Sequence, residues 1–272
     1  MTESPKSAER REMASECLSI ADDAAAVVMT GYRSRPSADE KEVHDLVTEF
    51  DRRSQDLILA RLERAFPGAC VIAEESSTGE VIVPEGLVFT VDPIDGTTNF
   101  VHGHPFWCVA IGALYDRVPI FGAVLAPCLG LAWLGATSND ESSFATRNGE
   151  ACHVSGTTKL ASSMIATGFP PDRTRGPEDN FDSFMRVKKL ARAVRRCGSA
   201  AIDLAFVADG AYDGYWERRL LLWDCAAAGA IVLAAGGRIT AIGGGPPCYE
   251  KGHIVATNGL IHDVLVRAVG EA

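Results

Sequence analysis

The 272-residue chain has the length of one large domain or two modest ones, and its 47% apolar composition is typical of a globular protein rather than a disordered or fibrous one. A net charge of −10 argues against a nucleic-acid partner, which would need a clustered basic face. The charged first twenty residues lack the apolar core of a secretory signal, and the longest apolar stretch is broken by Asp224. We therefore expect a cytoplasmic protein without a membrane partner.

Eight cysteines are scattered through apolar neighbourhoods without a Cys-x-x-Cys pair. We interpret them as small buried thiols in a reducing compartment rather than as a zinc site. Basic residues recur at helical spacing between Arg186 and Arg196, which favours a solvated or oligomer-forming helix face over a nucleic-acid site.

The N-terminal half combines helical and strand-like periodicity. The spacing of apolar residues predicts one helix within the first thirty residues and a second from about Glu49 to Ala65. Short apolar runs predict strands at 70–73, 87–91, 106–114, 120–126 and 131–136, the last three as an antiparallel meander. Asn148-Gly149 predicts a hairpin turn.

The C-terminal half alternates helix-like and strand-like segments. Helices are predicted at about 179–191, 199–208, 223–236 and 260–269, and strands near 193, 238–242 and 253–256. The chain has neither an internal repeat nor a low-complexity linker. We therefore expect a single domain over 1–272, with an N-terminal α+β half of about 1–160 and a C-terminal α/β half of about 161–272.

Carboxylates stand beside turns or helix starts in separated segments of the chain. They are Asp51, Glu74-Glu75, Asp92 with Asp95, Glu217, and Asp224. Two of these segments follow apolar strands, and ligands bind beyond the carboxyl ends of strands in open α/β sheets. Several ionised carboxylates in one crevice would repel one another strongly without cations. Because oxygen ligands suit Mg²⁺ or Mn²⁺, the sequence predicts a site for one of these cations.

The segment from Asp92 to Phe100 is the most informative one. We expect the strand to end at Asp92 in a tight turn, with Pro93 between the two acids, so that the carbonyl of Ile94 can face the same way as both. The backbone N–H groups of Gly96, Thr97 and Thr98 would seat a phosphate if they begin a helix. Asp224 is expected to cap the helix that follows it. Taken singly, each feature has an ordinary structural explanation, and only their combination favours a site.

The segments Ala73-Glu74-Glu75-Ser76, Asp92-Pro93-Ile94-Asp95-Gly96-Thr97-Thr98-Asn99-Phe100 and Trp223-Asp224-Cys225-Ala226-Ala227-Ala228-Gly229 together resemble the inositol monophosphatase family. The similarity of order and spacing runs from Asp45 to the last predicted helix. It implies an α+β fold, a layered αβαβα sandwich of the inositol monophosphatase and fructose-1,6-bisphosphatase type. It also implies a lithium-sensitive enzyme and a homodimer.

The resemblance also implies roles for individual residues. Glu74, Asp92, the Ile94 carbonyl, Asp95 and Asp224 would hold two or three Mg²⁺ ions, for which Mn²⁺ could substitute. Thr97, paired with Asp51, would orient the attacking water together with Glu74, and Gly96 and Thr97 would bind the phosphate. Asp95, Gly198, Ser199, Ala200 and Glu217 would contact the alcohol portion of the substrate. Ala73 and Cys225 depart from the usual family residues, and neither is expected to touch a ligand.

We therefore predict a Mg²⁺-dependent phosphomonoesterase that hydrolyses myo-inositol 1-phosphate to inositol and phosphate. Fructose 1,6-bisphosphate, histidinol phosphate and 3′-phosphoadenosine 5′-phosphate are alternative substrates. A haloacid-dehalogenase-type phosphatase also carries an Asp-Gly-Thr segment, but its two acids are two residues apart, whereas Asp92 and Asp95 are three apart. A catalytically dead metal-binding module is a more distant alternative.

Overall fold

The computed structural model describes residues 4–42, 45–77, 81–138, 142–170 and 178–270. The helices are α1 (Ser7–Met29), α2 (Glu49–Ala65), α3 (Thr97–Val101), α4 (Phe181–Leu190), α5 (Ala200–Ala208), α6 (Leu222–Ala234) and α7 (His262–Val269). A hairpin of β1 (Ala38–Glu42) and β2 (Asp45–Thr48) precedes α2.

Two further sheets form the body of the molecule. The seven-stranded sheet has the order β3 (Cys70–Ala73), β4 (Leu87–Asp95), β5 (Cys108–Tyr115), β6 (Val118–Ala126), β7 (Leu131–Ala136), β8 (Phe144–Arg147), β9 (Glu150–Ala151). The five-stranded sheet has the order β11 (Ala193–Arg195), β10 (Met164–Thr167), β12 (Gly214–Glu217), β14 (Ile254–Thr257), β13 (Arg238–Ala241).

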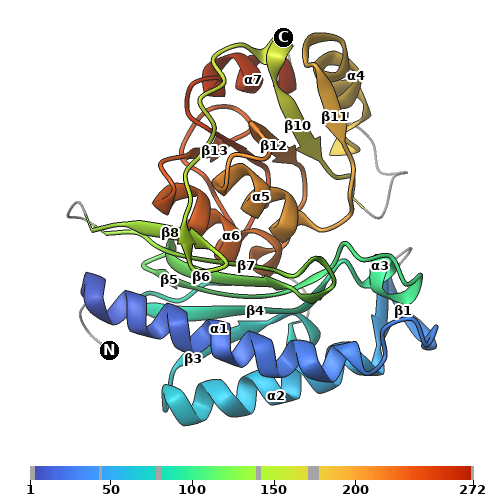
Figure 1. Ribbon diagram of the computed structural model, residues 1–272, viewed down its shortest axis with the longest axis vertical. Helices are drawn as coiled ribbons and strands as arrows, with labels where there is room; N and C mark the ends of the chain where they lie inside the picture. Colours follow the sequence, from blue (N-terminus) through green and yellow to red (C-terminus); the bar gives the residue numbers. More distant parts are fainter. Residues whose placement is uncertain (1–3, 43–44, 78–80, 139–141, 171–177, 271–272) are drawn as a thin grey trace.

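Helices and sheets alternate in five layers (Figure 1). Helices α1 and α2 cover the outer face of the seven-stranded sheet, α5 and α6 lie between the two sheets, and α4 and α7 cover the five-stranded sheet. This arrangement confirms the αβαβα sandwich. Because helices cover both faces of each sheet, the strands read as continuous apolar runs: Val88 packs toward α5 and α6, whereas Phe89 packs toward α1 and α2.

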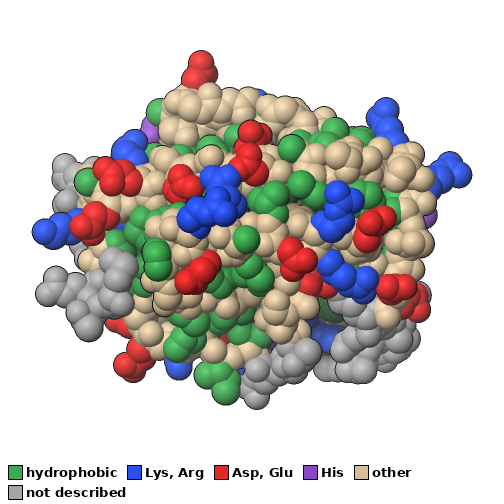
Figure 2. All heavy atoms as spheres, turned by 90° about the horizontal axis from the view of Figure 1, so that it is seen from below, with side chains coloured by type: hydrophobic (Ala, Val, Ile, Leu, Met, Phe, Trp, Pro, Cys, Tyr) green, Lys and Arg blue, Asp and Glu red, His purple; other side chains and the backbone are tan. Residues whose placement is uncertain are grey.

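The outer helical layer carries charges of both signs, interspersed across the face shown in Figure 2. Arg61 of α2 forms ion pairs with Glu16 and Asp23 of α1, which link the two helices. In the described part of the chain, no helix is both long enough and apolar enough to cross a membrane.

Helix α6 lies unusually close to the seven-stranded sheet. A side chain on Gly122 would overlap the backbone of Ala227, and a Cβ on Gly112 would lie 2.7 Å from the Ala227 Cα. The small residues Ala226, Ala227 and Ala228 are fully or almost fully buried at this contact. The close approach fixes the position of the first turns of α6, which carry Asp224.

The helix α2 and the strands β3 and β7 have the predicted bounds, and the other predicted elements differ by a few residues at their ends. The hairpin at Asn148-Gly149 is also confirmed, with φ of 52° and 81° at these two residues. The expectation that the strand ends at Asp92 is wrong. β4 continues to Asp95, and its pairing with β5 shifts register between Asp92 and Asp95.

Candidate active site

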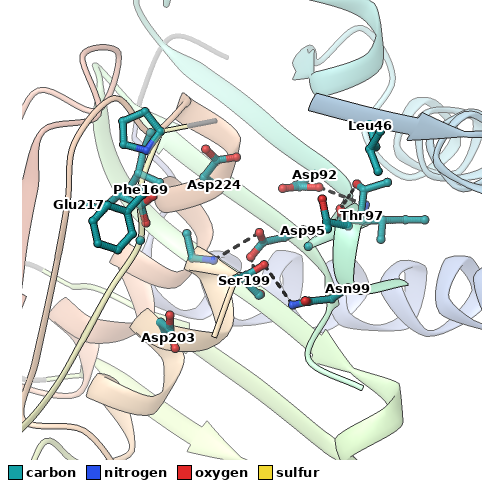
Figure 3. Close-up of a pocket in the computed structure, with 18 of the residues that line it drawn as sticks. Leu46, Asp92, Asp95, Thr97, Asn99, Phe169, Ser199, Asp203, Glu217 and Asp224 are labelled. Carbon is teal, nitrogen blue, oxygen red and sulfur yellow. Dashed lines mark hydrogen bonds between the residues drawn. The ribbon is translucent and has the colours of Figure 1, made fainter. Parts of the chain in front are cut away.

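A cavity of about 550 Å³ lies between the two halves of the chain. The N-terminal half contributes Glu74, Asp92, Ile94, Asp95 and the segment 96–99. The C-terminal half contributes 168–170, Arg196, 198–200, Asp203, Glu217, 219–220 and Asp224. Figure 3 shows Asp92, Asp95, Asp224 and Glu217 around this space.

Parallel pairing brings the first two acids together. β3 and β4 are parallel neighbours, with Ala73 opposite Val91, so Glu74 and Asp92 follow at the same edge of the sheet. The Asp92 side chain turns the backbone, because its Oδ1 accepts a hydrogen bond from the Ile94 N–H at 3.0 Å. Glu75, the other acid of the pair, does not line the cavity, and its N–H donates to Gln55 Oε1.

Asp95 joins the two halves of the molecule. Its Oδ2 accepts hydrogen bonds from Ser199 Oγ at 2.6 Å and the Ala201 N–H at 2.7 Å, and its Oδ1 accepts one from the Ala200 N–H at 3.3 Å. The free N–H groups at the beginning of α5 thus hold a carboxylate of β4 (Figure 3). Ser199 is also the N-cap of α5, since its Oγ accepts from the Ile202 N–H.

Asp224 reaches the cavity from α6, but it is not the N-cap of this helix. The helix begins at Leu222 and Leu221 is the N-cap, so Asp224 occupies the third helical position. Its Oδ2 accepts a hydrogen bond from the Leu221 N–H at 2.7 Å, which is the half of a capping box that the third helical residue supplies; the leucine side chain cannot supply the other half. The carboxylate stabilises the helix start and lines the cavity at the same time.

Thr97 and Asp51 form a pair behind the acids. The Thr97 hydroxyl lies 3.1 Å from Asp51 Oδ1 and 3.0 Å from the Ile94 carbonyl oxygen, so its single proton is shared between two acceptors. Asp51 is fully buried, and its Oδ2 accepts from the N–H and the hydroxyl of Thr48. Asp51 does not line the cavity, and its hydrogen bond with Thr97 connects it to a residue that does.

The loop after β4 is fixed to the C-terminal half. Gly96 has φ of 96°, and a Cβ there would lie 3.0 Å from the Gly198 carbonyl oxygen, so both conformation and space require glycine. The Asn99 amide donates to the carbonyl oxygens of Phe106 at 2.6 Å and Cys197 at 2.9 Å. Helix α3 follows directly, and its first residue is Thr97, as expected from the sequence.

The buried acids repel one another, and this repulsion and their burial raise their pKa values. Burial, together with the nearby charges of Glu74, Asp95 and Asp224, raises the pKa of Asp92 well above its usual range. Burial and the charges of Asp95 and Glu74 likewise raise the pKa of Asp224. Burial also raises the pKa of Asp95, although its hydrogen bonds oppose this shift. A cation among these groups would relieve both the desolvation and the repulsion.

The donor chemistry of this wall fits a hard divalent cation. Glu74, Asp92, Ile94, Asp95 and Asp224 all line the cavity, and each carries a carboxylate or carbonyl oxygen. Within the described residues, however, no three His, Cys, Asp or Glu side chains already surround a common point at ligand distance. The structure thus presents a carboxylate-rich wall rather than a finished coordination shell.

The opposite wall is built around Glu217. Gly168 packs directly against the Glu217 carboxylate, which a side chain at that position would overlap. The Tyr215 hydroxyl donates to Glu217 Oε2. Burial raises the pKa of Glu217 to about 7, while the Tyr215 hydroxyl and the Arg196 guanidinium oppose this shift.

Sequence reasoning missed several residues of the cavity. Glu40 and Leu46 come from the β1–β2 hairpin, Phe169 and Pro170 follow β10, and Asp203 lies within α5. The basic cluster does not form one common face: Arg196 lines the cavity, whereas Arg186 donates to carbonyl oxygens at the end of α7. The expectation that all cysteines are buried is also wrong, because Cys70 is exposed, although all eight are free thiols.

The chain belongs to the inositol monophosphatase family, whose sequence profile matches residues 9–272. An inositol-1-monophosphatase from Synechocystis is 42% identical over 226 residues, which cover 83% of this chain and 77% of that protein. A Nus factor SuhB from Pseudomonas aeruginosa is 36% identical, and the match covers 82% of each protein. The solved structure of an inositol monophosphatase from Anabaena matches with a TM-score of 0.83 at 37% identity, over 94% of both chains.

Proposed function

We propose that this protein is a metal-dependent phosphomonoesterase that hydrolyses myo-inositol 1-phosphate to inositol and phosphate. One observation carries the proposal: Glu74, Asp92, Asp95 and Asp224, drawn from three separate segments, line a single cavity in a chain of the inositol monophosphatase family. Relatives in Synechocystis and Mesorhizobium japonicum are named inositol-1-monophosphatase, which supports inositol phosphate as the substrate.

Two or three Mg²⁺ ions are part of the proposal. Glu74, Asp92, Asp95, Asp224 and the Ile94 carbonyl would hold them, and Mn²⁺ could replace them. Bound there, such ions neutralise phosphate charge, lower the pKa of a bound water and stabilise the leaving oxygen. The raised pKa values of Asp92 and Asp224 support this role, since both groups lack a compensating positive charge among the causes of their shifts.

The chain's own groups would orient the reactants. Thr97, with its hydroxyl directed by Asp51 and Ile94, would accept a hydrogen bond from the attacking water, and Glu74 would share that task. The backbone N–H groups of Gly96 and Thr97 would face the phosphate. Positioning of this kind, with charge neutralisation, supplies most of the catalysis in phosphoryl transfer.

The alcohol portion would occupy the C-terminal side of the cavity, near Gly198, Ser199, Ala200 and Glu217. Ser199 and Ala200 also donate hydrogen bonds to Asp95, so these residues would hold Asp95 in place for the substrate as well as flank it. A relative from Staphylococcus aureus, 25% identical, was solved as a complex with 2′-AMP. That structure supports a nucleotide phosphate, 3′-phosphoadenosine 5′-phosphate, as one alternative substrate; fructose 1,6-bisphosphate and histidinol phosphate are the others.

Three further properties complete the proposal. We expect inhibition by Li⁺ and a homodimer because of membership in the family, and a reducing, cytoplasmic setting because all eight cysteines are free. Nucleic acid is not expected as a partner, given the net charge of −10, and a membrane is not expected because Asp224 interrupts the longest apolar stretch.

Phosphate release from inositol 1-phosphate, fructose 1,6-bisphosphate, histidinol phosphate and 3′-phosphoadenosine 5′-phosphate tests the proposal, with Mg²⁺ or EDTA and with or without Li⁺. We expect the highest kcat/KM for inositol 1-phosphate, and no activity in EDTA. Asp95→Asn should nearly abolish turnover of all four esters, whereas Glu217→Gln should chiefly change their order of preference. Metal-independent hydrolysis, or trapping of an aspartyl adduct by beryllofluoride, would contradict the assignment.

A further inference from the structure

Helix α5 buries a carboxylate in the wall of the cavity. Asp203 is the one charged residue in the sequence of this helix, AAIDLAFVA, and its side chain is only 2% exposed. Ile202 and Leu204, its neighbours in the chain, are fully buried. A carboxylate in such surroundings is costly unless hydrogen bonds or a ligand compensate for the lost water.

Structural carboxylates in this protein have such compensation. Asp213, also buried, accepts hydrogen bonds from Ser155 Oγ at 2.6 Å and from the Met164 N–H at 2.7 Å. By contrast, Asp203 Oδ1 is buried without a hydrogen-bond partner anywhere in the described residues. The Cys197 thiol forms a side-chain hydrogen bond with Asp203 and lowers its pKa, but a thiol is a weak donor, so Asp203 has weaker compensation than Asp213.

The position of Asp203 directs it toward the proposed substrate site. It lies one helical turn after Ser199, and its N–H donates to the Ser199 carbonyl oxygen at 3.1 Å, so both residues lie on one face of α5. Asp203 lines the cavity together with Glu217 and Arg196. In Figure 3 it lies on α5 below Ser199, on the side of the view away from Asp92 and Thr97.

The chemistry of this wall suits a neutral donor of hydrogen bonds. Asp203 and Glu217 are close enough for the charge of Glu217 to raise the pKa of Asp203, although burial is the larger cause. Hydroxyl groups can donate to both carboxylates without adding a charge, and Arg196, which opposes the shift, reduces the repulsion between them.

We propose that Asp203 is a specificity-determining residue that accepts a hydrogen bond from a hydroxyl of the substrate's alcohol portion, beside Glu217. The site would then favour phosphate esters of polyols over esters whose alcohol carries no further hydroxyl. This inference rests on the proposed phosphatase function and adds a residue to its substrate site.

The test compares two esters in the presence of Mg²⁺, myo-inositol 1-phosphate and phenyl phosphate, whose alcohol portion has no free hydroxyl. The readout is the ratio of their kcat/KM values in the wild type, Asp203→Asn and Asp203→Ala. Asp203→Asn keeps the size of the side chain, so it should fold even if the truncation to alanine does not. Asp209→Asn is the matched control, because Asp209 lies at the end of the same helix, outside the cavity, and binds Trp133 Nε1.

Loss of a hydrogen bond to a charged group should lower the ratio about ten- to hundredfold in Asp203→Ala and less in Asp203→Asn. The loss should be mainly in KM for inositol 1-phosphate, and Asp209→Asn should keep the wild-type ratio.

Three outcomes would overturn the inference. If Asp203→Asn and Asp203→Ala keep the wild-type ratio of the two kcat/KM values and only their melting temperatures change, Asp203 has a structural role. A greater loss for phosphoethanolamine than for inositol 1-phosphate would show a site for an ammonium group instead. If the wild type releases phosphate from neither ester, the proposed function itself fails, and this inference fails with it.

Discussion

Replacing Asp92 by asparagine would remove a charge from the cavity while keeping the hydrogen bond that shapes it. Asp92 Oδ1 accepts from the Ile94 N–H at 3.0 Å, and an amide oxygen in the same place can accept that bond. We expect Asp92→Asn to be more stable than the wild type without metal, to respond less to Mg²⁺, and to lose nearly all turnover.

The size of the effect follows from the surroundings of Asp92. The side chain is 2% exposed, and three other carboxylates raise its pKa in addition to burial. Relief of an uncompensated buried charge stabilises a protein by on the order of 1–3 kcal/mol. For 272 residues the entropy of unfolding is roughly 0.6 kcal/mol/K, so the melting temperature should rise by about 2–5 °C.

Magnesium should stabilise the wild type more than Asp92→Asn. A single ion present at about 100 times its Kd stabilises the folded wild type by roughly 3 kcal/mol, which corresponds to about 5 °C. Because Asp92→Asn loses a charged ligand, this stabilisation should be largely absent in the variant. The two proteins should therefore exchange their order of stability between EDTA and Mg²⁺.

The pH dependence supplies a further check. The folded state raises the pKa of Asp92, so it binds the proton more tightly than the unfolded chain does. The free-energy cost of ionising Asp92 in the folded state is therefore absent below the ordinary pKa of about 4, and it grows as the pH rises. In EDTA, the stability difference between Asp92→Asn and the wild type should be largest near pH 7–8 and should vanish toward pH 4.

Differential scanning calorimetry at several pH values, in EDTA and in Mg²⁺, measures the stability difference without metal, the stabilisation by Mg²⁺ and the pH dependence. Phosphate release measures the loss of turnover. The reasoning would be refuted if the metal-free wild type melted at or above the temperature of Asp92→Asn at pH 7. Equal stabilisation of both proteins by Mg²⁺ would refute the assignment of Asp92 as a ligand.

Three other substitutions test separate parts of the structure. Asp95→Asn cannot keep all three hydrogen bonds from α5, so urea denaturation without metal should show a loss of about 2–3 kcal/mol; a stability equal to wild type would argue against this link between the halves. His262, buried between two threonine hydroxyls, has its pKa lowered by burial to about 4. The wild type should therefore lose stability as the pH falls from about 6.5 to 4, and His262→Gln should show a flatter profile of urea midpoints, whereas equal slopes would contradict the explanation. Gly168→Ala should displace Glu217 and raise KM for inositol 1-phosphate severalfold, while Gly243→Ala, which has open space, should leave it unchanged; identical KM values in the two variants would rule out this role of Gly168.

Local patterns in the sequence predicted the elements that carry the acids. Helix α2 and strand β3 have clear apolar periodicity and plain end signals, and the residues from Asp92 to Phe100 combine features that rarely occur together. The predicted ligands Glu74, Asp92, Ile94, Asp95 and Asp224 do line one cavity, and their individual roles stay predictions.

Other features could not be predicted because they depend on contacts distant in sequence. Asp203 looks like a single acid in an apolar helix, and only the docking of α5 shows which face it occupies. Strand β1 has the sequence ADEKE, which lacks any apolar alternation. The sequence also did not predict β10 and β12, which form by pairing between segments far apart in the chain. The true position of Asp224 depends on where α6 begins, which the apolar sequence on both sides leaves undefined.

The hydrogen bonds from α5 to Asp95 make the contact between α5 and β4 a part of the proposed active site. A carboxylate of β4 is oriented by N–H groups that lie more than a hundred residues further along the chain. A shift of α5 away from β4 would release this carboxylate without breaking the pairing of any strand. Turnover should therefore report on the packing of α5 against β4, and low denaturant concentrations that loosen this contact should reduce activity before the sheets unfold.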